Sequence, residues 1–278
     1  MIKLAPIHTF IDPFVSAASG LLLKDDQFHL ISDDELYAVV IDKKDPAQGK
    51  KIQLYSGTLP EEKKLRKQTK PDLESIVELP SGDLLCIPSG SELHRNEGKL
   101  IKADGTGIKT LFFKSLYSEL RKSFSELNIE GAVVVEDWLR LFQRGNGKKN
   151  QNSTIDVNLK DFLMGKNTIS YIKHMELGKH NGANLSFTDA TLFNDQIYFL
   201  AVAENCESTY LDGEFKGSGL GIMTLKGKVL GLEPLDLKNK PEGLCIDADS
   251  FYVVTDDDDR SKPSRLFKGK LPAAKTQQ

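Results

Sequence analysis

Residues 242–259 read EGLCIDADSFYVVTDDDD, and this short stretch decides the predicted fold. It begins with a carboxylate and a glycine, runs through a short apolar segment and turns at residues 247–249. A second apolar segment follows, and a polar loop closes the unit. Apolar runs of about four to eight residues that are bounded by turn residues are typical of hairpin strands. The stretch therefore predicts a β-hairpin whose first residue and closing loop lie at the same end.

Four earlier segments have the same shape. They begin at Ser19 (SGLLLKDDQFHLISDD), Glu74 (ESIVELPSGDLLCIPSGS), Glu130 (EGAVVVEDWLRLFQRGNG) and Asp189 (DATLFNDQIYFLAVAEN). The successive starts are 55, 56, 59 and 53 residues apart. A repeat of this length has room for four strands and their turns, as in one blade of a propeller. The sequence thus predicts an all-β fold, a five-bladed β-propeller with blades of about 55 residues. Six blades are the alternative.

The ring of a propeller must close, and residues 2–11 (IKLAPIHTFI) are well placed to add an outer strand to the last blade. We find no linker, low-complexity tract or break in composition, so we expect residues 1–278 to form a single propeller domain. The charged run at 61–70 (EEKKLRKQTK) is interpreted as a solvated loop between blades.

Composition excludes several classes of protein. The 278 residues include 37 Lys and Arg and 40 Asp and Glu, for a net charge of −3. A chain so near neutrality has no general attraction to nucleic acid or to anionic membranes. It lacks an apolar run long enough for a membrane span and begins without a secretory signal. We expect a soluble monomer that is cytoplasmic by default, or exported if a signal has been removed.

The first strand of a propeller blade usually lies nearest the axis, so the opening residues should converge around the central channel. Carboxylates gathered there would repel one another unless something neutralises them. Ca²⁺ takes about six to eight oxygen ligands, and a donor set without His or Cys argues against zinc. The alternative is that the acids pair with basic side chains or share protons. The predicted Ca²⁺ ligands are Ser19, Glu74, Glu130, Asp189 and Glu242.

The closing loops should surround this ring at the same end of the channel. Their arginines are suited to hold an anionic small molecule, because a guanidinium matches carboxylate and phosphate oxygens. The alternative is that they form ion pairs between blades. The predicted ligand-binding residues are Arg95, Arg144 and Arg260, and the predicted general bases are Asp33, Asp34 and Glu204.

The repeats also resemble known families. The openings Glu-Gly and Glu-Ser, with Arg-Gly-Asn-Gly at 144–147 and Pro-Glu-Gly-Leu at 241–244, look like an uncharacterised bacterial propeller family. That family is related to phytase-like and lactonase-like propellers. The ring order Ser, Glu, Glu, Asp, Glu is also similar to the calcium-activated nucleotidases (apyrases). The latter resemblance implies one central Ca²⁺, held here by Ser19, Glu74, Glu130 and Glu242. Blade four departs from the pattern, since Ser186, Thr188 or Asp189 can take that place.

The sequence therefore favours a metal-dependent hydrolase of a phosphate ester or another anionic small molecule. In such an enzyme the ion polarises an oxygen of the substrate and lowers the pKa of a bound water. The first alternative is a non-catalytic propeller that binds a ligand or a protein and uses the ion only structurally. The second is a lactonase-like hydrolase.

Overall fold

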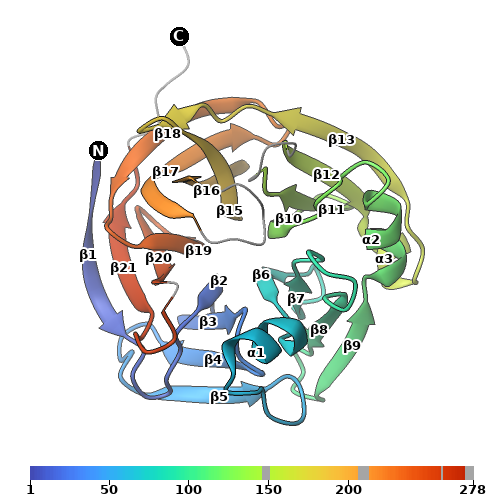
Figure 1. Ribbon diagram of the computed structural model, residues 1–278, viewed down its shortest axis with the longest axis horizontal. Coiled ribbons are helices and arrows are strands. Elements are labelled where there is room, and N and C mark those ends of the chain that lie inside the picture. The colour runs from blue at the N-terminus through green and yellow to red at the C-terminus, as the bar shows by residue number, and fades with distance from the viewer. Residues whose placement is uncertain (146–150, 206–212, 258, 273–278) are drawn as a thin grey trace.

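The computed structural model describes residues 1–145, 151–205, 213–257 and 259–272. Antiparallel sheets stand around a central axis and form a propeller-like ring, which Figure 1 shows from one face. The chain visits the sheets in order, and each four-stranded sheet is built almost wholly from one sequence repeat, whereas the nine-stranded sheet combines two repeats with the N-terminal strand. The prediction of an all-β fold is confirmed.

Three sheets have four strands each, paired in sequence order. The first contains β2 (Ala18–Lys24), β3 (Gln27–Ser32), β4 (Tyr37–Asp42) and β5 (Gly49–Gln53). The second contains β6 (Leu73–Glu78), β7 (Leu84–Pro88), β8 (Glu97–Ile101) and β9 (Ile108–Phe112). The third contains β10 (Ile129–Val135), β11 (Trp138–Gln143), β12 (Asn152–Asn158) and β13 (Ile169–Met175).

A nine-stranded sheet completes the ring, in the order β14-β15-β16-β17-β18-β1-β21-β20-β19. One part contains β14 (Lys179–His180), β15 (Ala183–Phe193), β16 (Gln196–Asn205), β17 (Glu214–Thr224) and β18 (Val229–Asp236). The other part contains β19 (Lys240–Asp247), β20 (Ser250–Asp256), β21 (Arg265–Lys270) and β1 (Ile2–Thr9). The amino-terminal strand β1 pairs antiparallel with β21, so the expected closure by the N-terminal segment is confirmed.

The tight turns between first and second strands follow from residues that tolerate a left-handed backbone. Asp25 and Asp26 have φ of 51° and 57°, and Asn194 and Asp195 have φ of 48° and 57°. Each pair forms a two-residue hairpin loop with positive φ at both positions, a geometry that matches the twist of the flanking strands. The turn residues predicted from the sequence therefore set the hairpin registers.

The innermost strands β2, β6, β10, β15 and β19 contact one another in that order, and β19 contacts β2. Apolar side chains fill the space between neighbouring sheets. Phe142 of β11 and Phe187 of β15 meet edge to face with ring centroids 5.1 Å apart, for example. Such packing places the polar ends of the inner strands around the axis.

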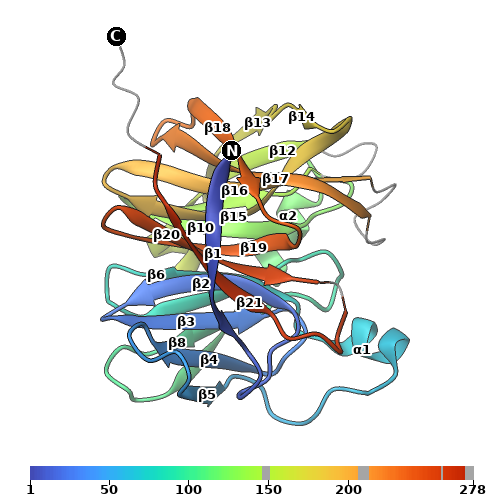
Figure 2. The ribbon, with the colours of Figure 1, turned by 90° about the vertical axis from the view of Figure 1, so that its left-hand side faces the viewer.

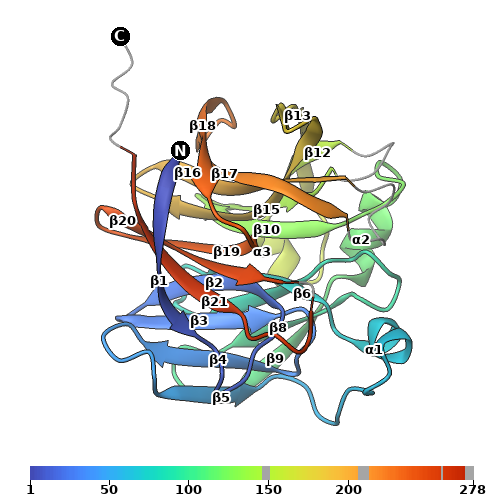
Figure 3. The same cartoon turned by 60° about the vertical axis from the view of Figure 1, so that its left-hand side comes forward.

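Three short helices lie among the strands: α1 (Lys63–Thr69), α2 (Lys114–Leu120) and α3 (Leu159–Leu163). Helix α1 stands out on one face of the ring, as Figures 2 and 3 show. It corrects the interpretation of 61–70 as a solvated loop, because Arg66 is buried and binds Asp34. Within the described residues, no helix is long and apolar enough to cross a membrane.

Ala248 offers a test of the turn chemistry. It is an exposed residue with φ of 53°, a conformation in which a Cβ atom costs about 1–2 kcal/mol. We expect Ala248→Gly to raise the free energy of unfolding by about 0.5–1 kcal/mol in urea denaturation. The matched control Ala5→Gly, at an exposed position of β1, should lower it by a similar amount. Destabilisation by both variants would contradict this account.

Candidate functional site

Each inner strand contains one residue that the pairing with its hairpin partner skips. Such a β-bulge leaves the extra residue out of the ladder and turns its side chain in a new direction. The skipped residues are Ser19, Glu74, Glu130, Thr188 and Glu242. They occupy equivalent places in successive sheets and therefore define the ring that the sequence predicted, with one change in the fourth sheet.

The channel end of this ring contains a cavity of about 100 Å³, here called the central cavity. Ser19, Glu74, Glu130 and Glu242 all line it. The structure thus brings together four of the predicted metal ligands. Ser19 directs its hydroxyl into the protein, where it donates to the carbonyl oxygen of Leu73.

In the fourth sheet the equivalent residue is Thr188 and not the predicted ligand Asp189. Thr188 is buried and donates a hydrogen bond of 2.7 Å to the carbonyl oxygen of Pro241. Ser19 makes the same kind of bond, so in both sheets a hydroxyl binds the carbonyl oxygen just before the next ring residue. The ring therefore contains three carboxylates and two hydroxyls, and each hydroxyl ties its strand to the next inner strand.

Asp189 lies one residue later and is outside the lining of the central cavity. The equivalent residues on three other inner strands are glycines, Gly20, Gly131 and Gly243, whose added Cβ would press on the next inner strand. For Gly243 that Cβ would lie 2.8 Å from the backbone nitrogen of Leu21. Asp189 instead accepts a 2.7 Å hydrogen bond from the backbone N–H of Leu244 and one of 2.8 Å from that of Ala190. Its carboxyl group therefore links β15 to β19 by a hydrogen bond. Burial raises the pKa of Asp189 well above its ordinary value.

A chain of ion pairs runs along one side of the central cavity. Arg144 lies 3.1 Å from Glu130 and 2.5 Å from Glu204, and Lys240 lies 3.5 Å from Glu204 and 2.6 Å from Glu242. Burial alone would raise the pKa of Glu204, but the charges of Arg144 and Lys240 hold it below its ordinary value. Acidic and basic side chains alternate along this chain, which links β10, β16 and β19.

A second chain of ion pairs lies on the other side. Lys70 contacts Asp33 and lies 3.0 Å from Asp72, and Arg95 lies 2.8 Å from Asp72. The hydroxyl of Ser89 also donates to Asp72. Burial would raise the pKa of Asp72, but Lys70, Arg95 and this hydrogen bond lower it. Asp72 is thus held as a carboxylate inside the protein.

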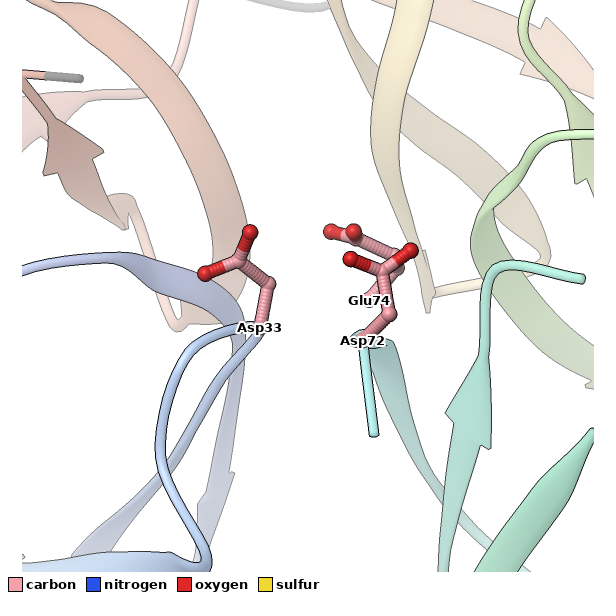
Figure 4. A group of neighbouring side chains, drawn as sticks. All are labelled: Asp33, Asp72 and Glu74. Atoms are coloured by element: carbon pink, nitrogen blue, oxygen red, sulfur yellow. The ribbon is translucent and has the colours of Figure 1, made fainter. Parts of the chain in front are cut away.

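Glu74 stands between the two chains. Carboxylate oxygens of Asp33, Asp72 and Glu74 lie within 4.8 Å of one another, and Figure 4 shows Asp33 facing the other two. None of the described residues forms a salt bridge or hydrogen bond with Glu74, although Lys70 acts on it at longer range. Burial and the charges of Glu130, Asp72 and Asp33 raise the pKa of Glu74 well above its ordinary value.

Several polar atoms around the cavity have no hydrogen-bond partner among the described residues. They are Oδ1 of Asp33, Oε2 of Glu242 and Nε of Arg95. Burial, opposed by Lys70, raises the pKa of Asp33 to about 6, and burial, opposed by Lys240, raises that of Glu242 to about 8. Buried polar atoms are rarely left unpaired, so this cavity suits water or another polar guest.

The predicted catalytic and ligand-binding residues fall into two places. Asp33, Arg95 and Arg144 line the central cavity, and Glu204 adjoins it through Arg144. Arg95 and Arg144 form ion pairs with carboxylates, the alternative that the sequence left open. The others, Asp34 and Arg260, line a neighbouring pocket, here called the outer pocket.

Sequence reasoning missed Lys70, Asp72 and Lys240. A signal for two of them existed, because a polar residue recurs two positions before the ring glutamates. Asp72 and Lys240 precede the ring residues Glu74 and Glu242 by two positions, as Asn128 precedes Glu130. All three line the central cavity. Lys70 stands four positions before Glu74 and so falls outside this recurrence.

Comparisons with known proteins agree with the fold. The sequence pattern of a family described as "Family of unknown function (DUF6929)" matches residues 14–271. No curated protein matches the chain. Among solved structures, glutaminyl cyclase from Myxococcus xanthus is similar with a TM-score of 0.53 and 9% identity, over 98% of this chain and 99% of that one. The PQQ-bound aldose sugar dehydrogenase from Streptomyces coelicolor has a TM-score of 0.52 and 10% identity, over 96% and 97%. At such identities the likeness shows a propeller-like fold alone.

The first ion-pair chain makes a prediction about stability. Arg144 and Glu204 are 5% and 4% exposed, so Arg144→Ala would leave two buried carboxylates without their shared partner. We expect a loss of about 3–5 kcal/mol in the free energy of unfolding, measured in urea. The control Lys122→Ala breaks an exposed pair with Glu119 and should cost about 1 kcal/mol or less. Equal losses in the two variants would show that the buried chain of ion pairs contributes no more to stability than an exposed surface pair.

The raised pKa of Glu242 makes a prediction about pH. Its carboxyl keeps a proton in the folded protein up to about pH 8, whereas in the unfolded chain it ionises near pH 4.5. This group therefore stabilises the fold below about pH 4.5, and the contribution is lost as pH rises through about 8. In chelator, the drop in Tm from pH 5 to pH 8.5 should be smaller for Glu242→Gln than for the parent protein.

The control for this experiment is Glu119→Gln, an exposed position of α2. It should show the same drop in Tm as the parent protein. An undiminished drop in Glu242→Gln would mean that Glu242 does not change its protonation on folding.

Proposed function

This chain belongs to the Family of unknown function (DUF6929), and from the geometry of its central cavity we propose that it binds a divalent cation there, Ca²⁺ above others. The observation that supports this most directly is Glu74, an acidic side chain of the cavity that lacks a basic partner among the described residues. A bound cation would supply the missing positive charge.

The neighbours of Glu74 favour a cation over a proton as its normal partner. Asp33 and Asp72 approach it within 4.8 Å, so three carboxylates face one point from two sheets. Like charges at this separation repel one another strongly unless a cation or a proton intervenes. Lys70 and Arg95 already offset part of the charge of Asp33 and Asp72, and one divalent ion could accept oxygens from all three carboxylates, whereas a proton serves only one.

The donor chemistry and the space available favour Ca²⁺. Asp33, Asp72, Glu74 and Glu242 offer carboxylate oxygens, and hard cations such as Ca²⁺ prefer oxygen ligands with waters completing the shell. The cavity of about 100 Å³ exceeds the roughly 10–15 Å³ needed by one water, so it has room for an ion with part of its hydration. The unpaired atoms of Asp33 and Glu242 are acceptors, which suits a cation and its waters.

We also propose that residues 1–278 form one five-bladed propeller. The nine-stranded sheet then divides between β18 and β1, whose parallel pairing spans only Ile2–Leu235 and Lys3–Asp236. The divided parts, with the three four-stranded sheets, correspond to the five sequence repeats.

A second candidate function is metal-dependent hydrolysis of a small anionic ester, with the cation polarising the substrate. It is favoured by the outer pocket, which opens beside the central cavity and shares Asp33 and Lys70 with it. In that reaction a water oxygen attacks the phosphorus or acyl carbon and the ester bond to the leaving oxygen breaks. Asp33 would accept a proton from the water and pass it to the leaving oxygen, which ends as an alcohol.

Titration calorimetry of Ca²⁺ into chelator-stripped protein tests the proposed site. We expect one ion per chain, with affinity lowered at least tenfold in Glu74→Gln because a charged ligand is lost. The matched control is Glu78→Gln, on the same strand but exposed and paired with Lys24. It should bind Ca²⁺ as the parent does.

Absence of binding to the parent protein, or equal affinity in Glu74→Gln, would overturn the cation site. Turnover of phosphate esters by the Ca²⁺-loaded protein, lost in Asp33→Asn, would support hydrolysis. Ca²⁺ binding without turnover on such a panel would favour a propeller that uses the ion structurally.

A further inference from the structure

The outer pocket has a volume of about 110 Å³ and lies between the loop after β3, helix α1 and the loop after β20. Basic side chains from these segments reach it, among them Lys63, Arg66 and Arg260. The proposed cation site does not use these three residues. They raise the question of what the pocket holds.

The floor of the pocket contains one carboxylate between two guanidinium groups. Asp34 lies 2.7 Å from Nε of Arg66 and 3.0 Å from Nε of Arg260. Arg66 also donates to the backbone oxygen of Asp34. Among the residues that line the pocket, one carboxylate thus contacts two guanidinium groups.

Two acids outside the pocket lining also contact these guanidinium groups. Glu35, which is 17% exposed, lies 3.6 Å from Arg66 and offsets its charge, whereas Glu61 lies 3.9 Å from Arg260 and is 93% exposed. Neither of them lines the pocket. An ion pair with a side chain so fully exposed is weak, because water screens it.

The acids that do line the pocket already have partners. Lys70 contacts Asp33, and Lys262 lies 3.2 Å from Asp259. Asp256 also has an interaction partner. Lys63 is exposed on α1 and makes no hydrogen bond or ion pair with the described residues. Its ammonium group and the outer edge of Arg260 are therefore available to a ligand.

We propose that the outer pocket binds the oxyanion group of a small molecule, a phosphate or a carboxylate, on Arg260 and Lys63. Guanidinium groups match the oxygens of both anions and hold them by charge-assisted hydrogen bonds. A cavity of about 150 Å³ is known to hold a benzene molecule, so this smaller pocket fits the head group and leaves the rest of the ligand outside. A cation in the central cavity would strengthen binding through its charge, but the anion site does not require it.

Calorimetry with inorganic phosphate, and separately with acetate, tests this assignment in chelator. We expect binding of at least one of the two anions, weakened about tenfold or more in Arg260→Gln and in Lys63→Ala. The control Lys109→Ala removes an exposed lysine of β9, far from the pocket in the fold, and should leave binding unchanged. Two separate variants keep the test valid if one of them fails to fold.

Phosphate binding alone assigns a phosphoryl group, and acetate binding with the same dependence assigns a carboxylate. Failure of both anions to bind, or equal binding by both variants and the parent, overturns the proposal. The cation site is tested apart from it, since Arg260→Gln should keep the parent's affinity for Ca²⁺ measured without phosphate. Glu74→Gln should likewise keep the parent's affinity for the anion measured in chelator.

Discussion

Compensation of charge inside the central channel is the constraint on which the rest of this structure depends. Bulges in the inner strands turn acidic side chains toward the axis, where an unpaired carboxylate is costly. Arg144, which follows β11, and Lys240 of β19 offset this cost on one side, and both contact Glu204 of β16. The ion pairs that neutralise the channel therefore also join neighbouring sheets at one end. Apolar side chains between the sheets complete the attachment.

The carboxylates of the ring are neutralised to different extents on the two sides of the channel. This difference separates a structural network of ion pairs from a candidate binding site. On one side, Glu130 and Glu242 have basic partners within ion-pair distance. On the other, Glu74 faces Asp33 and Asp72 with no such partner among the described residues. The outer pocket, which several basic side chains line, opens on this same side. A cation and an anion bound in adjoining cavities would attract each other, which is the arrangement that metal-assisted hydrolysis of an anionic ester uses.

Local pattern predicted some parts of the candidate site and missed others for physical reasons. Ser19, Glu74, Glu130 and Glu242 were found because each stands just before an apolar run and these runs recur at a nearly regular spacing. Asp189 was chosen over Thr188 because its chemistry resembles that of the glutamates, but the bulge places Thr188 at the equivalent point. The run at 61–70 looked like a solvated loop because it is rich in charge. Only its contact with Asp34 shows why Arg66 is buried there.

The sequence by itself determined the strands, their turns and the order of the repeats, because these depend on short stretches of chain. Alternation of apolar residues selects a strand, and residues such as Asp25 that tolerate positive φ select a tight turn. The tertiary structure alone decided which charges meet. Arg144 and Glu204 are 60 residues apart and come together only when the ring closes. Whether a buried charge is paired depends on that closure, and so the difference between Glu130 and Glu74 cannot be read from either residue's own segment.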